Sequence, residues 1–140
     1  FQFEEHTADV QVKAWGSTLE EAFCQTALSL MKTISPNLDL IQDMQVLDIQ
    51  IEAEDLKALL FDFLSEFLYI FDVKKLIFKT ILVQRIEKVN KKYHLVAHLK
   101  GEKFDREKHE IGTEVKAITY SYMNIEKVND KYQINIVFDI

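Results

Sequence analysis

Carboxylates at the end of the chain are the first groups that could bind a cation. Asp139 alternates with the apolar residues of the last segment, and Ile140 follows it. If Ile140 ends the chain, its α-carboxylate lies next to the Asp139 side chain, and such close carboxylates repel each other unless a cation or donors join them. Oxygen ligands suit a hard cation such as Ca²⁺ or Mg²⁺. A solvated acidic strand end is the alternative, and these residues leave both open.

A polar motif, His6-Thr7-Ala8-Asp9, precedes the first predicted strand. The neighbours of Asp9 are small or apolar, so its carboxylate either caps a turn or points into a shared polar pocket. Aspartate commonly stabilises its own turn backbone, and the residues alone favour that interpretation. His6 likewise fits the role of a hydrogen-bonded structural residue.

A third group lies in residues 112–120, which read G-T-E-V-K-A-I-T-Y. In a regular strand, Glu114 and Lys116 project from the same face and are able to form an ion pair. Exposed pairs of this kind are common and contribute under ~1 kcal/mol to stability. An ordinary surface ion pair is therefore the simplest interpretation.

Nucleophilic and nucleotide-hydrolysing chemistries find little support. The chain has no G-x-S-x-G elbow and no glycine-rich phosphate loop, since its 3 glycines are scattered. Cys24 falls within a predicted apolar helix stripe and is expected to be a small buried residue. His94 and His98 fall in a predicted strand, where a four-residue offset separates Cα atoms by roughly 13 Å. No ligand role is expected for either histidine.

Composition indicates one globular domain over residues 1–140, with 48% hydrophobic and 29% charged residues. The net charge of −6 disfavours direct, tight binding to nucleic acid, because basic side chains drive that binding. Cations and basic protein partners fit the charge better. No apolar run reaches the ~18 residues that span a membrane, and no signal peptide is recognised. An intracellular protein, cytoplasmic or nuclear or both, is expected.

The spacing of apolar residues predicts the elements that position these groups. Residues 10–15 form a strand, and Ser17 with Glu20 marks a capping box that opens a helix ending near Pro36. Residues 47–53 alternate as a half-buried strand. A second helix begins near Glu54 or Asp55 and carries one apolar stripe as far as residue 68.

The rest of the chain reads as β-structure. Strands are predicted at residues 75–89, 93–99, 114–128 and 131–140, with turns at 90–92 and 129–130 and a charged, flexible loop at 101–112. The pattern predicts an α+β single-domain sandwich. In it, a mixed, mainly antiparallel sheet carries both amphipathic helices on one face.

Four motifs resemble those of the archease family, occur in the family's order and extend over nearly the whole chain. They are H-T-A-D-V at 6–10, A-W-G with L-E-E-A-F at 14–23, residues 112–120, and F-D-I at 138–140. The segment S-E-F-L-Y at 65–69 resembles the eukaryotic branch of that family.

This resemblance implies an accessory factor that activates the RtcB-type ligase of tRNA splicing and has no complete catalytic site of its own. The family promotes guanylylation and multiple turnover of the ligase, or of a complex that contains it. Its metal site corresponds to Asp9, Asp139 and the terminal carboxylate of Ile140, which would lie on adjacent strands. Ca²⁺ is the expected cation, with Mg²⁺ or Mn²⁺ as alternatives.

Four further residues lie in or beside family motifs. His6, His109, Glu114 and Lys116 are candidates to support the metal ligands or to contact the ligase. Two other functions stay open: a metal-dependent hydrolase of phosphodiesters or nucleotides that uses the same carboxylates, and a general chaperone, for which the sequence offers no large exposed apolar segment.

Overall fold

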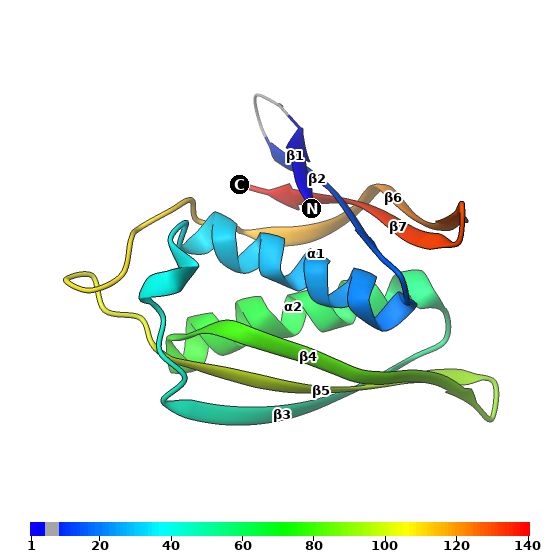
Figure 1. The fold of residues 1–140 in the computed structure, drawn as a ribbon, viewed down its shortest axis with the longest axis horizontal. Helices are drawn as coiled ribbons and strands as arrows, with labels where there is room; N and C mark the ends of the chain where they lie inside the picture. The colour runs from blue at the N-terminus through cyan, green and yellow to red at the C-terminus, as the bar shows by residue number, and fades with distance from the viewer. Residues whose placement is uncertain (5–8) are drawn as a thin grey trace.

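The computed structural model describes residues 1–4 and 9–140 and contains two helices and two antiparallel sheets (Figure 1), which confirms the predicted α+β class. The elements, in chain order, are β1 (Gln2–Glu4), β2 (Asp9–Gly16), α1 (Leu19–Ile34), the short 3-10 helix η1 (Leu38–Leu40), β3 (Gln45–Ala53), α2 (Leu56–Lys74), β4 (Leu76–Val89), β5 (Lys92–Lys103), β6 (Ala117–Val128) and β7 (Lys131–Asp139). Neither helix of the described residues is both long and apolar enough to cross a membrane.

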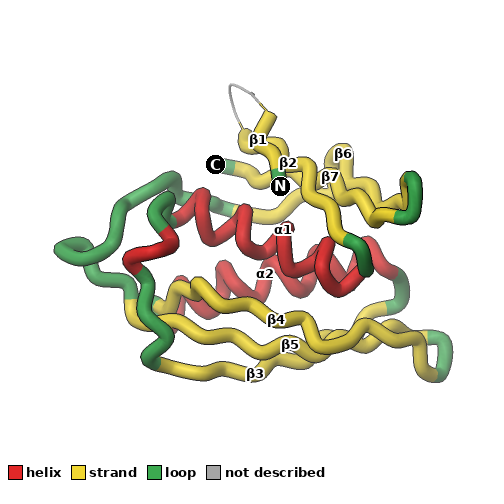
Figure 2. The backbone as a smooth tube through the Cα atoms, in the orientation of Figure 1, coloured by secondary structure: helices red, strands yellow, loops and turns green. Residues whose placement is uncertain are grey.

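The strands divide into two sheets, where one mixed sheet was expected. One sheet has the order β1-β2-β7-β6 and the other β3-β5-β4, and the helices lie between them (Figure 2). At 100° per residue, buried and half-buried apolar positions span more than half of the circumference of α2. A helix with so wide an apolar surface needs cover on two sides, which two sheets provide.

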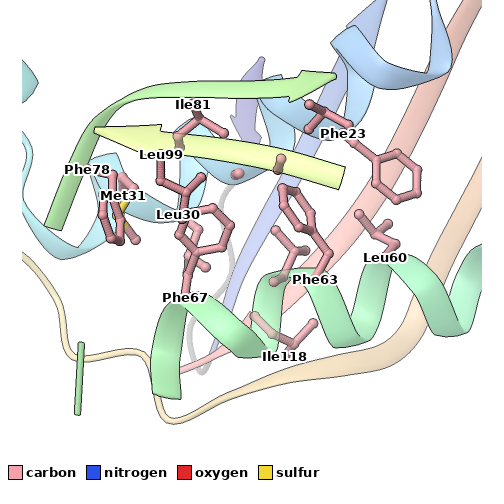
Figure 3. Close-up of a cluster of buried hydrophobic side chains, with 14 of the residues drawn as sticks. Phe23, Leu30, Met31, Leu60, Phe63, Phe67, Phe78, Ile81, Leu99 and Ile118 are labelled. Carbon is pink, nitrogen blue, oxygen red and sulfur yellow. The ribbon is translucent and has the colours of Figure 1, made fainter. Parts of the chain in front are cut away.

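The core fills the space between the layers. Aromatic side chains of α2 form a chain of edge-on contacts, with ring centroids 5.1 Å apart for Phe63 and Phe67 and 6.0 Å apart for Phe67 and Phe78. Leu99 of β5 and Ile118 of β6 reach the same cluster from opposite sheets (Figure 3). Both sheets therefore depend on one shared core.

Local chemistry sets the ends of the helices. The Thr18 hydroxyl caps α1 by accepting from the Glu21 amide, and the Glu21 carboxylate accepts from the Ser17 amide. The capping box thus lies one residue later than the predicted Ser17–Glu20 pair. Asp55, one of the two predicted caps, accepts from the Ala58 amide at the start of α2.

Two tight hairpin turns confirm the predicted β-pairs. Asn90 and Lys91 have φ of 53° and 68°, and Asn129 and Asp130 have φ of 51° and 64°. Positive φ at both central residues is the signature of the turn that matches the twist of two-residue hairpins. Asparagine tolerates this conformation better than most residues.

The predicted strand at 114–128 is shorter and less regular than expected. β6 begins at Ala117, and its pairing with β7 shifts between Thr119 and Asn124. Tyr122 within this irregularity has a φ of 57° and is 79% exposed. The buried residues change parity across this irregularity, from Ile118 to Met123, as extra residues on one strand of a pair require.

Candidate cation site

Asp9 and Asp139 are direct neighbours on adjacent strands. Asp9 opens β2, Asp139 closes β7, and the two residues are partners in the antiparallel register. Directly opposed residues of an antiparallel pair have Cβ atoms about 4.5–5.5 Å apart. Figure 1 shows β2 beside β7, and the register of these strands brings together two aspartates that are 130 positions apart in the sequence.

Strand alternation assigns Asp9 and Asp139 to the sheet face opposite the core; Asp139 is exposed and Asp9 is half-buried. Side chains alternate along each strand, and Val12 and Ala14 of β2 and Phe138 of β7 are buried against the core. Asp9 and Asp139 occupy the alternate positions of β2 and β7, so alternation assigns them to the opposite face of the sheet. Like charges placed directly opposite each other are destabilising, and a cation between them would reverse that effect.

A cavity of about 740 Å³ lies beside Asp9 at the end of the sheet next to α1; Asp9 and Ile140 line it, whereas Asp139 lies outside its lining. Two further charged residues line the same cavity, Glu4 of β1 and Lys32 of α1. Neither was predicted from the sequence. Helical spacing predicts no more than that Lys32 lies on the exposed side of α1. Its place in the same cavity as Asp9 depends on how α1 packs against β2.

The loop before β6 closes the cavity. The Gly112 and Thr113 amides donate to the Ile34 and Thr33 carbonyls at the end of α1, with N–O distances of 2.9 and 2.8 Å. A Cβ on Gly112 would lie 2.2 Å from the Thr33 carbonyl oxygen, so only glycine permits this approach. The loop is therefore fixed on the helix end and supplies a wall of the cavity.

His109, predicted as a ligand-supporting or ligase-contact residue, is buried inside the same loop. Its Nδ1 accepts from the Asp105 amide at 2.9 Å, so the ring proton lies on Nε2, which donates to the Glu102 carboxylate at 2.9 Å. Lys108 donates to Glu102 from the other side at 2.8 Å. The part of 101–112 expected to be flexible is thus held by a buried histidine, and residues 101–103 belong to β5.

Glu102 is the electrostatic centre of this cluster. Its burial, the largest contribution, would raise the pKa of the carboxyl group, but hydrogen bonds from Lys108, the Gln42 amide and His109 together lower that pKa to about 2. The ionised carboxylate is therefore the form that the loop requires. Local sequence pattern does not predict this role of Glu102, because Glu102 and His109 meet only when the loop folds back on β5.

Glu114 and Lys116 lie outside the cavity that contains Asp9. Both precede β6 and line a second cavity of about 540 Å³ at the ends of the two helices. Among the residues that the structure describes, they form no ion pair with each other. The Lys116 amide donates to the Asp139 carbonyl at 2.8 Å, which ties this segment to the candidate site through the backbone. His6 lies outside the described residues.

The donor set fits a hard divalent cation. The carboxylates of Asp9 and Asp139 offer oxygen atoms only, as Ca²⁺ and Mg²⁺ prefer. Within residues 1–4 and 9–140, no three His, Cys, Asp or Glu side chains gather closely enough to hold a metal. Two aspartates alone leave coordination incomplete, so the terminal carboxylate and solvent would supply the remaining ligands.

Comparison with known proteins agrees with this architecture. The family model described as "Archease protein family (MTH1598/TM1083)" matches residues 1–140. Protein archease of Pyrococcus furiosus is 46% identical over 137 residues, which cover 97% of this chain and 95% of that protein. Protein archease-like of Drosophila melanogaster is 36% identical over 143 residues, covering 100% and 90%.

Solved structures show the same fold. The solution structure of Methanobacterium thermoautotrophicum protein 1598 has a TM-score of 0.84 and 28% identity, covering 99% of this chain and 97% of that one. A Thermotoga maritima crystal structure, described as an archease and possible chaperone, has a TM-score of 0.61 and 23% identity over 98% of this chain and 94% of its own. That second similarity concerns the fold alone.

Archaeal and eukaryotic relatives both match, so the expected eukaryotic branch stays a prediction. The family model matches every residue of the chain, and the alignments to the Pyrococcus furiosus and Drosophila melanogaster proteins cover at least nine-tenths of those proteins. The chain belongs to the archease family.

Proposed function

We propose that this archease is an accessory factor that activates an RtcB-type RNA ligase in tRNA splicing. It promotes guanylylation of the ligase and its repeated turnover, and it performs no catalytic step itself. A divalent cation, with Ca²⁺ preferred, is held by Asp9, Asp139 and the terminal carboxylate of Ile140. The observation that carries the proposal is the direct pairing of Asp9 with Asp139 across β2 and β7.

The charges of the site support a role for a cation. Two aspartates in register repel each other, and the carboxylate of Glu4, which pairs with Lys13 at 3.7 Å, lines the cavity beside Asp9. Among the described residues, Lys32 is the positive side chain of that lining, and its ammonium group lies 5.9 Å from the centre of the Phe1 ring. A bound divalent cation would offset the remaining negative charge.

The overall charge supports a protein partner over direct contact with RNA. A net charge of −6 repels a phosphate backbone, whereas a ligase that holds RNA presents basic surface. An activator of this kind would act on RNA only through its partner. The proposed partner is therefore the ligase, or a complex that contains it.

Multiple-turnover RNA ligation tests the proposal. A cognate RtcB-type ligase at sub-stoichiometric concentration is assayed alone, with the wild-type chain, and with Asp9→Ala or Asp139→Ala. We expect turnover to rise with the wild type and not with either variant. Asp39→Ala, which removes an exposed aspartate outside the cavity, is the matched control and should activate normally.

The same preparations separate the activator from a hydrolase that uses these carboxylates. The isolated chain is incubated with Ca²⁺, Mg²⁺ or Mn²⁺ and with nucleotide and phosphodiester substrates. An activator leaves these substrates intact. The alternative outcome is sustained hydrolysis by the wild type, loss of that hydrolysis in Asp139→Ala, and no effect of the chain on ligation. That outcome would assign the protein as a metal-dependent hydrolase and not as an activator.

A further inference from the structure

One side of α2 is left open between the two sheets. α2 contacts β6 and β3, and each of these strands is the free edge of its own sheet. Four residues of α2 that are exposed or half-buried occur at the spacing of one helical face, namely Asp62, Glu66 (half-buried), Tyr69 and Val73. With Tyr120 of the neighbouring β6, these residues are called the α2 face below.

The α2 face exposes unusually large apolar side chains. Tyr69 is 59% exposed and Val73 is 61% exposed, one helical turn apart. Tyr120 is 52% exposed and stacks on Phe61 with ring centroids 4.3 Å apart and an interplanar angle of 3°. Exposed aromatic side chains held rigidly by neighbours are typical anchors of protein interfaces.

The charge of this face has one sign. Asp62 and Glu66 are one helical turn apart, and like charges at that spacing destabilise a helix by a few tenths of a kcal/mol. Among the residues that the structure describes, neither carboxylate forms an ion pair. Lys57 lies about 140° round the helix from Asp62 at 100° per residue.

Negatively charged residues of α2 and its cap also lie near the Tyr120 hydroxyl. Its partial burial, and then the nearby carboxylates of Asp62 and Asp55, raise the pKa of the Tyr120 hydroxyl. Asp55 is the cap of α2, so its charge belongs to the beginning of the same helix. The carboxylates therefore act together on the exposed aromatic ring.

We propose that the α2 face is the docking surface for a basic polypeptide segment of a partner protein. Arginine or lysine side chains of the segment pair with Asp62 and Glu66, while its apolar side chains cover Tyr69, Val73 and Tyr120. A groove of about 430 Å³ lined by Asp62, Glu66 and Tyr69 receives one such side chain. The surface shares no residue with the cation site and does not depend on the proposed ligase activation.

Charge complementarity selects this occupant over others. RNA and anionic lipid surfaces carry the same sign as Asp62 and Glu66 and are repelled. A two-fold contact of the α2 face with a second copy of the chain would bring two surfaces of the same negative charge together. A basic segment gains both charge pairing and apolar contact.

The first test is titration of the full chain at 0.15 M salt with a synthetic amphipathic peptide that carries arginines at i and i+4 beside leucines. Amide chemical shifts locate the peptide, and a peptide with glutamate in place of arginine is the control. We expect the shifts to concentrate in α2 and β6 with the arginine peptide and to be absent with the glutamate peptide. Shifts spread over other acidic surfaces would overturn the proposal.

Variants show whether the peptide binds the α2 face specifically or is attracted to any acidic part of the protein. The double variant Asp62→Lys with Glu66→Lys keeps the like-charge spacing in the helix but reverses its sign, and it should weaken binding at least about tenfold. Tyr69→Ala changes no charge and should also weaken binding about tenfold. Glu107→Lys with Glu110→Lys makes the same change of net charge on an exposed loop and should leave binding unchanged.

Two results would contradict a docking surface for basic segments. Equal losses in the α2 and loop double variants, with no effect of Tyr69→Ala, would mean that only net charge attracts the peptide. Binding of a single-stranded RNA oligonucleotide at the same amides would assign the face to nucleic acid instead. Circular dichroism and thermal unfolding of each variant exclude loss of fold as the cause.

Discussion

Asp9 and Asp139 face the same side of one sheet because they are partners in the β2–β7 register. The pairing places the Cβ atoms of the two aspartates about 5 Å apart. No local feature of either strand requires this arrangement, since a shift of the register by two residues would keep both apolar faces inside. The register, and with it the pairing of the two aspartates, is therefore set by tertiary packing and not by the local sequence.

Removal of one carboxylate should change how a cation affects stability. A ligand that binds only the folded state stabilises it by about 2.7 kcal/mol at a concentration 100 times its Kd. We expect Ca²⁺ to raise the free energy of unfolding of the wild type by an amount of this order and to have little effect on Asp139→Asn. In EDTA, the variant should equal or slightly exceed the wild type, because the repulsion from Asp9 is gone.

Urea unfolding with Ca²⁺ or EDTA measures both effects, and Asp39→Asn is the matched control. One glycine appended after Ile140 moves the terminal carboxylate away from Asp139 and tests the third ligand separately. Equal Ca²⁺ stabilisation of the wild type, Asp139→Asn and the extended chain would count against the cation site.

Acid should destabilise the protein through Glu102. The folded-state pKa of its carboxyl group is about 2, against an ordinary value of 4.5. A lowered folded-state pKa contributes stability that is fully present above pH 4.5 and is lost as the pH falls toward 2. We expect Glu102→Gln to be less stable than the wild type at pH 6.5 and to lose less stability between pH 4.5 and 2.

Urea unfolding at pH 6.5, 4.5, 3.0 and 2.0 tests this difference in slope. Glu107→Gln changes an exposed carboxylate of the same loop and should follow the wild type. Parallel curves for the wild type and Glu102→Gln would show that the cluster of Glu102, Lys108 and His109 does not govern acid stability.

Gly112→Ala should loosen the loop that forms a wall of the candidate site. The added methyl group would lie 2.2 Å from the Thr33 carbonyl oxygen and 2.8 Å from that of Ile34, so the loop or the end of α1 has to move. Crowding of this kind typically costs about 1–3 kcal/mol. We expect a lower melting temperature and weaker stabilisation by Ca²⁺.

Thr113→Ala is the control for this change, because it keeps the backbone hydrogen bond from residue 113 to Thr33. Differential scanning calorimetry with and without Ca²⁺ measures both variants. A normal melting temperature for Gly112→Ala would mean that the loop adapts to the extra methyl group without cost.

Cys24 should be unreactive in the folded protein. Burial, and then the nearby Glu21 carboxylate, raise the pKa of its thiol to about 11, and Sγ donates to the Ile81 carbonyl at 2.8 Å. At pH 8 about one thiol in a thousand would be ionised, and thiolate is the reactive form. Ellman's reagent should react slowly with native protein and rapidly in urea; rapid native reaction would contradict a buried thiol.

The sequence determined most of the secondary structure. Apolar spacing located both helices and the main strands, and turn residues such as Asn90 and Asn129 located the hairpins. These features depend on neighbours within a few positions, which is the range over which helix and strand periodicities act. The same reasoning missed the interruption at Tyr122 and placed the α1 cap one residue early, because both depend on backbone geometry at single positions.

The tertiary structure decided what the charged residues do. Pairing of β2 with β7 set Asp9 opposite Asp139, packing of α1 brought Lys32 to the same cavity, and folding of the loop buried His109 against Glu102. The division into two sheets likewise follows from the wide apolar surface of α2. Contacts between distant segments depend on register and packing, which local periodicity does not encode.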